Sequence, residues 1–150
     1  MKKTLLGFTA AAAMGGAAFA GPVTPETVAF ADGAVSASLT GAAGDAEKGR
    51  EWFAGRKLGN CLACHQNADL EEESFHGEVG PSLDGVADRW TEAELRGIIV
   101  NAKMMFEGTI MPSFYRTENG ARTHEKFAGK TILSAEEVED VVAYLLTLKE

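Results

Sequence analysis

The last part of the chain carries the clearest helical pattern. Its apolar residues recur at three- and four-residue steps and fall on one stripe: Val138, Val141, Val142, Leu145 and Leu148. Ser134 precedes this stripe and Glu137 follows three residues later, which is the sequence of a capping box. The pattern predicts a helix that begins after Ser134 and runs to Leu148.

A second helix is predicted to run to about Phe53, with Asp45 as its N-cap. Lys48 stands where a capping box would have Glu or Gln, so the box is incomplete. Gly49 lies inside this helix, where it costs about 1 kcal/mol relative to Ala. A close crossing with another helix would explain the glycine.

Two more helices are predicted between these. Thr91 and Glu94 form another capping box, which predicts a helix to about Phe106. A short helix is expected from Cys61 to about Ala68. No segment alternates between apolar and polar residues with a period of two, so the sequence predicts an all-α domain of four or so short helices.

The other segments have the composition of loops. Residues 70–80 are acidic and irregular, and residues 108–129 form a long loop. Residues 21–43 hold Pro, Gly, Ala, Ser and Thr with few charges, and we expect an N-terminal extension there. Val35 and Leu39 make this extension too apolar for a free linker, so it covers a partner or packs back on the domain.

Composition and charge set the class of protein. Hydrophobic residues make up 45% of the 150, which indicates a globular chain rather than a disordered one. The chain has 14 Lys and Arg against 22 Asp and Glu, a net charge of −8. Nucleic-acid binding is not expected, because nothing resembles the basic stripe that displaces counterions.

The first twenty residues have the pattern of a secretory signal peptide. Lys2 and Lys3 precede an apolar stretch that ends in an A-x-A sequence at Ala20, so we expect cleavage before Gly21. A membrane anchor is the alternative, but the stretch is shorter than the ~20 residues that a spanning helix needs. No later stretch is long and apolar enough to span. The sequence predicts an acidic, soluble domain exported to the periplasm, without a membrane span after cleavage.

Both cysteines lie in one C-x-x-C-H motif, formed by Cys61, Cys64 and His65. This motif is typical of covalent haem attachment, in which two thiols add to the haem vinyl groups and the imidazole ligates the iron. A disulfide or thioredoxin-like redox pair would need a βαβ context, and zinc would need a second ligand pair. The other histidines, His76 and His124, are isolated and are predicted to be solvated loop residues.

A haem needs a second axial ligand or an open site, and Met111 is the candidate. Pro112 follows it and favours an extended backbone, which would hold the ligand on a stiff loop. A thioether opposite histidine raises the reduction potential, as an electron carrier requires. Core filling is the alternative for Met111. Met105 is predicted to be a packed core residue, since it lies on the apolar face of the helix after Thr91, and Met104 lies off that face.

Taken together, residues 45–148 resemble the class I (mitochondrial-type) cytochromes c. The resemblance rests on the helix with Gly49, the C-x-x-C-H motif, Gly80-Pro81-x-Leu83, Met111-Pro112 and a C-terminal helix bearing Tyr144. It implies the class I fold around one covalent haem c, with the Gly49 helix crossing the last helix near Tyr144. It also implies that the Pro81 carbonyl accepts a hydrogen bond from the His65 ring and that Leu83 lies against the haem.

Longer stretches look like the SoxX family, the small monohaem subunits of SoxAX complexes in bacterial thiosulfate oxidation. They lie at residues 25–28, 56–60, 80–86, 111–115 and 129–133. The resemblance implies a heterodimer with a larger SoxA-type subunit, which carries the catalytic cysteine-ligated haem. The complex, an L-cysteine S-thiosulfotransferase, joins thiosulfate to a cysteine of a sulfur-carrier protein.

In such a complex this chain would relay the released electrons to a soluble cytochrome c and would not be catalytic alone. A free-standing electron-shuttle cytochrome c is the alternative function, and a sensor with an open distal site is a third. The sequence thus divides into a signal peptide at 1–20, an extension with possible partner contact at 21–43 and a cytochrome c domain at 44–150. The extension and an insert at 113–128 favour the subunit, since a free shuttle needs only a small docking patch.

Overall fold

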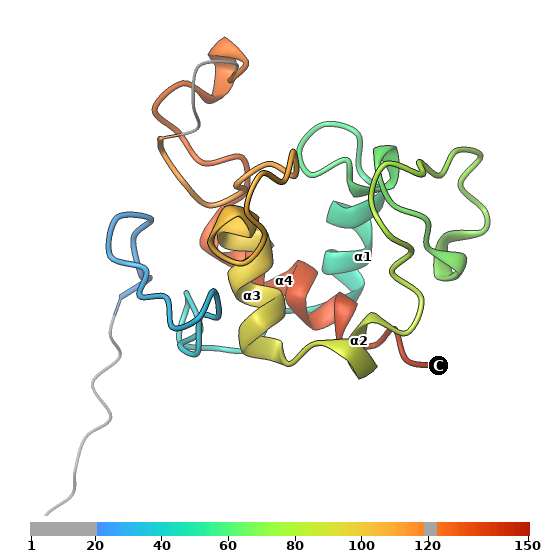
Figure 1. Cartoon of the computed structure of the whole chain (residues 1–150), viewed down its shortest axis with the longest axis horizontal. Helices are drawn as coiled ribbons and strands as arrows, with labels where there is room; N and C mark the ends of the chain where they lie inside the picture. Colours follow the sequence, from blue (N-terminus) through green and yellow to red (C-terminus); the bar gives the residue numbers. More distant parts are fainter. Residues whose placement is uncertain (1–20, 119–122) are drawn as a thin grey trace, which may run out of the picture.

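The computed structural model describes residues 21–118 and 123–150, and the expected signal peptide lies outside them. Helices and short 3₁₀ turns make up the regular structure of this part (Figure 1): α1 Ala46–Ala54, η1 Cys61–Ala63, η2 Ala68–Leu70, α2 Val86–Arg89, α3 Glu92–Asn101, η3 Ala102–Met104, η4 Glu125–Phe127 and α4 Ala135–Leu145. The described residues contain an isolated bridge between Ala31 and Ala34 but no strand, so the all-α prediction is confirmed. No helix among them has the length and apolar character needed to cross a membrane.

Three of the predicted helix starts are confirmed by their caps. The Asp45 side chain accepts from the backbone of α1, and the boxes at Thr91 and Ser134 are complete in α3 and α4. In each box the hydroxyl accepts from a backbone N–H of the first turn, and the glutamate three residues on accepts from the cap in return. The local sequence therefore fixes where these helices begin.

Helix ends and short helices differ from the predictions. The expected helix after Cys61 is a single 3₁₀ turn, and α2 was not predicted because four residues carry no periodicity. α4 ends at Leu145, although Leu148 still packs into the core. α3 ends at Asn101 rather than Phe106, because the Asn101 side chain accepts from its own backbone two residues on and the main chain leaves the helical region.

α1 and α4 cross so closely that only glycine fits between them. A Cβ on Gly49 would lie 1.9 Å from the Asp140 carbonyl oxygen and 2.8 Å from the Tyr144 Cβ. Next to this contact the Phe53 and Tyr144 rings meet edge to face, with centroids 5.5 Å apart. The expected crossing near Tyr144 is confirmed, and it accounts for a residue that weakens α1 by itself.

The N-terminal extension packs back on the domain (Figure 1, blue). Val35 and Leu39 are buried in the core, and the Val35 N–H donates to the Ala93 carbonyl at 2.8 Å. The Leu39 N–H donates to Glu139 Oε1 at 2.8 Å, which joins the extension to α4.

A buried ion pair supports this contact. Arg96 of α3 and Glu139 of α4 are 2% and 3% exposed and are bridged at 2.8 Å. Arg96 also donates to the Val35 carbonyl, so the pair binds the extension, α3 and α4 together. Burial by itself would lower the pKa of Arg96. The hydrogen bonds to Glu139 and Glu92 outweigh this effect and raise the pKa above its usual value. The guanidinium therefore stays charged, and without Glu139 this buried charge would be uncompensated.

We expect Glu139→Ala to lower the free energy of unfolding by about 3–5 kcal/mol, because it leaves the Arg96 charge buried without its partner. Guanidinium denaturation of the haem-loaded protein measures this change. Glu136→Ala is the matched control on the same helix, since Glu136 is exposed. Equal destabilisation by the two substitutions would contradict the structural role of the pair.

Candidate functional site

The cysteine motif forms one compact turn. Asn60 precedes it with a φ of 49°, and this left-handed residue turns the chain into η1. The N–H groups of Cys64 and His65 both donate to the Cys61 carbonyl, each at 3.0 Å. The two cysteines and the histidine therefore belong to one turn, and both cysteines are free and half-buried.

The thiol chemistry of this turn does not suit a redox pair. Desolvation, and to a smaller extent the neighbouring Cys64, raise the pKa of the Cys61 thiol to about 12. A thioredoxin-like pair needs an attacking thiolate with a depressed pKa. Cys61 is instead a neutral thiol at pH 7.

The His65 ring is held by the segment at Gly80. The Pro81 carbonyl oxygen lies 2.7 Å from His65 Nδ1 and accepts a hydrogen bond from it, as the resemblance implies. A Cβ on Gly80 would lie 2.3 Å from Cε1 of the ring, so a glycine is required beside it. The Gly80 N–H in turn donates to the Cys64 carbonyl at 2.7 Å. With Nδ1 as the donor, Nε2 has its lone pair free for a metal.

His76 is not the solvated loop residue that its sequence context predicts. It is half-buried, its Nδ1 accepts from the Asn67 N–H at 3.2 Å, and its Nε2 donates to the Leu70 carbonyl at 3.0 Å. Both ring nitrogens are used within the loop that follows the cysteine turn, so neither is left for a metal. His124 is exposed, as predicted, and accepts from the Lys126 N–H.

A buried polar network ties the same loop to α4. The fully buried Asn67 side chain donates to the Tyr144 hydroxyl, which donates to Asp69 Oδ2, both at 2.8 Å. Arg50 of α1 donates to the same carboxylate at 2.9 Å. Burial would raise the pKa of Asp69, but the bonds from Arg50 and Tyr144 outweigh it and the pKa is lowered. This network could not be predicted from the sequence, because it joins α1, the loop at Asn67 and α4, which are far apart along the chain.

Met111 lies on a segment that the end of α3 holds in place. Because α3 breaks at Asn101, the Ile99 and Val100 carbonyls lack their helical donors. They accept instead from the N–H groups of Phe114 and Tyr115, at 3.2 and 3.3 Å. Met111 itself is half-buried and packs against the hydrophobic core.

The other methionines lie elsewhere. Met104 is 50% exposed, and Met105 is half-buried with its Cβ against Gly33 of the extension. Met105 is therefore packed, as predicted, but it is not a core residue, because it lies against the extension. Leu83 is half-buried against the core, and its N–H donates to the Gln66 carbonyl at 3.0 Å.

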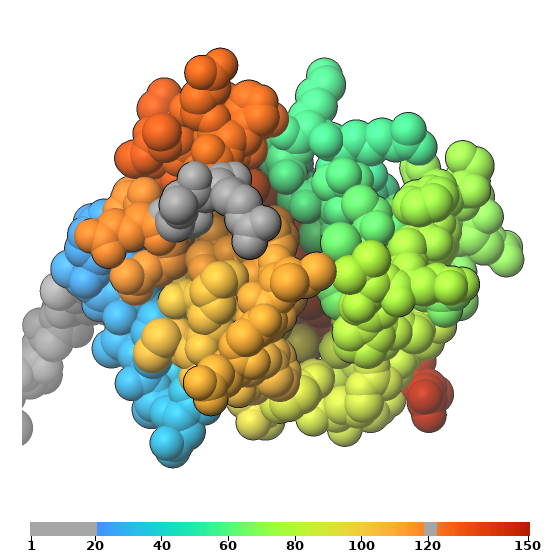
Figure 2. Space-filling view, turned by 45° about the horizontal axis from the view of Figure 1, so that its top comes forward, coloured from blue at the N-terminus to red at the C-terminus, as the bar shows by residue number. Residues whose placement is uncertain are grey.

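Two segments that carry candidate site residues border a hollow in the surface. Figure 2 shows this hollow between the segment near residue 110, in orange, and the segment near residue 80, in lime. The cysteine turn offers two free thiols and a histidine with a free Nε2, and the segment near residue 110 carries the Met111 thioether. Thiols that form thioethers, with imidazole and methionine as axial donors, fit a c-type haem.

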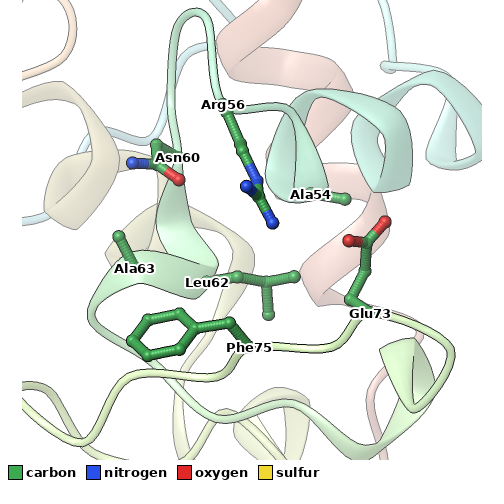
Figure 3. A pocket seen from close by; sticks show the side chains of 7 residues that line it. All are labelled: Ala54, Arg56, Asn60, Leu62, Ala63, Glu73 and Phe75. Carbon is green, nitrogen blue, oxygen red and sulfur yellow. The ribbon is translucent and has the colours of Figure 1, made fainter.

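A separate cavity of about 430 Å³ lies beside the cysteine turn (Figure 3). The Arg56 guanidinium, Leu62 and Phe75 point into it, and Glu73 stands at its side. Neither cysteine nor His65 lines it, so it is not the place for the haem.

Comparison with known proteins agrees with this geometry. Residues 46–149 match the family model described as cytochrome c. The chain is also similar to a chain in the crystal structure of SoxXA from P. pantotrophus, with 50% identity and a TM-score of 0.80. The match covers 86% of this chain and 99% of that chain. The comparison with curated proteins found no match.

We expect Gly80→Ala to displace the His65 ring, because the added methyl group would meet it 2.3 Å away. Overpacking of this kind costs about 1–3 kcal/mol of unfolding free energy. Denaturant unfolding measures the loss, with Gly21→Ala as the control, since a Cβ there meets nothing within 4 Å. Unchanged stability of Gly80→Ala would show that the His65 ring has room to move.

Proposed function

The chain belongs to the cytochrome c family, and from this premise we propose that its haem c is bound through Cys61 and Cys64, with His65 and Met111 as axial ligands. The haem supplies an iron that carries one electron at a time. The protein chain would hold the two axial ligands, cover the haem ring and set the reduction potential of the iron.

On the proximal side the task is to orient an imidazole. The Pro81 carbonyl accepts a hydrogen bond from the Nδ1–H of His65 at 2.7 Å, so the ring would bind metal through Nε2 and gains basicity. Gly80 allows the backbone to touch the ring face closely enough for this bond. Leu83, on the same segment, is the residue that we assign to the haem contact.

On the distal side the task is to supply a neutral, soft donor. The Met111 thioether favours the reduced iron and raises the potential. Backbone bonds from Phe114 and Tyr115 to the end of α3 keep the segment in place. A ligand held in this way moves little when the iron changes charge, which suits rapid electron transfer.

We further propose that the chain is the monohaem electron-transfer subunit of a SoxAX-type complex. The observation that carries this proposal is the 50% identity to a chain of SoxXA over almost the whole of that chain. The larger SoxA-type partner would hold the catalytic haem, where thiosulfate is joined to the cysteine of a sulfur-carrier protein. Both cysteines here are committed to haem, so this chain would pass the electrons on to a soluble cytochrome c.

The proposed location is the periplasm. Residues 1–20 would be removed on export, and the extension at 21–43 and the domain at 44–150 would remain as the mature subunit. The extension already packs on α3 and α4, so any partner contact that it makes would use its outer side.

We expect Met111→Ala to abolish the methionine–iron absorption band of the oxidised protein and to lower its reduction potential. Visible spectroscopy and redox titration measure both effects. Met104→Ala, at a 50% exposed methionine, is the matched control and should keep the band. A band that survives Met111→Ala would refute the ligand assignment, and its absence from the unaltered protein would favour a sensor with an open distal site.

The complex is tested by purification from the native periplasm. We expect the chain to elute together with a larger second haem protein, and the two to separate only under dissociating conditions. Gel filtration with haem staining reads out this association. Elution as a lone monomer would favour the free-standing electron shuttle.

A further inference from the structure

Two polar side chains at the end of α3 reach the segment that carries Met111. We propose that Asn101 and Lys103 are positioning residues for this ligand. The inference rests on the proposed role of Met111 at the iron, and it adds the device that keeps the ligand in place.

Asn101 stands at the break between α3 and η3. Its φ of −160° and ψ of 89° take the main chain out of the helix, and its Oδ1 accepts from the Lys103 N–H at 3.3 Å. The same Oδ1 accepts from the Ser113 hydroxyl at 2.7 Å. One carboxamide oxygen thus holds the helix break and the segment two residues beyond Met111.

Lys103 binds the ligand residue itself. Its Nζ donates to the Met111 carbonyl oxygen at 2.6 Å, while the Met111 N–H donates to Thr109 Oγ1 at 3.2 Å. Both backbone polar groups of Met111 therefore have partners, and Pro112 restricts the peptide that follows.

Neither Asn101 nor Lys103 needs to touch the iron to influence how firmly Met111 is held. For Met111 to leave its place, the segment must give up the bonds at its carbonyl and at Ser113. A hydrogen bond of about 1.4 kcal/mol corresponds to about a tenfold change in such an equilibrium. Loss of either side chain should therefore make Met111 easier to displace, while the rest of the core stays unchanged.

The test uses the haem-loaded full chain in its oxidised form, with imidazole as the competing ligand. We expect Lys103→Met and Asn101→Ala each to bind imidazole about tenfold more tightly than the unaltered protein. Loss of the methionine–iron band during the titration shows that Met111 is the ligand displaced. Lys103→Arg and Asn101→Asp keep a donor and an acceptor, respectively, and should bring the affinity back to within about threefold of the unaltered protein.

Lys149→Met is the matched control, since it removes the same charge from an exposed lysine at the far end of the chain. The inference is overturned if Lys103→Met binds imidazole within about twofold of this control, or if Lys103→Arg is no better than Lys103→Met. Lys103 is exposed, so this comparison holds even where Asn101→Ala does not fold. An unaltered protein without the methionine–iron band would overturn the ligand assignment, and this inference with it.

Discussion

The backbone contact between α1 and α4 is the constraint on which the rest of the structure depends. At Gly49 the two helices touch without an intervening side chain, and this sets the position of α4. One part of α4 then holds Asn67 and Asp69 through Tyr144, which fixes the loop after the cysteine turn. A turn earlier in α4, Glu139 holds the extension and α3. A single helix thus positions both halves of the site.

The two residues proposed as axial ligands are held by different physical means. His65 is oriented by one hydrogen bond to Pro81 and by a glycine that lets the backbone approach the ring. Met111 depends on a helix that ends early, since the unpaired carbonyls of α3 accept from Phe114 and Tyr115. His65 is therefore held by the segment at Gly80 and Pro81, and Met111 by the packing of a helix end.

Features that depend on neighbouring residues could be predicted from the sequence. The caps at Asp45, Thr91 and Ser134 each act within one turn, and the cysteine motif spans five residues. The helix crossing could also be predicted. Gly49 weakens its own helix, and a close contact with another helix explains why glycine is there. The resemblance to cytochromes c added the His65–Pro81 bond, which spacing alone does not reveal.

Features that join distant residues could not be predicted. Arg96 and Glu139 each look like ordinary polar positions on an amphipathic helix until the two helices are placed together. His76 has acidic and glycine neighbours that indicate solvent, yet its partners are the backbones of Asn67 and Leu70. The early end of α3 follows from the Asn101 side chain, which competes with the helix rather than interrupting its apolar pattern.

The bond between Leu39 and Glu139 joins residues one hundred positions apart. A chain that emerges from its N-terminus first must present the extension long before α4 exists to receive it. The Leu39 N–H therefore cannot reach its Glu139 acceptor until almost the whole chain is present. Forming this bond closes a loop of about one hundred residues, and long-range contacts of this kind slow the folding of a chain.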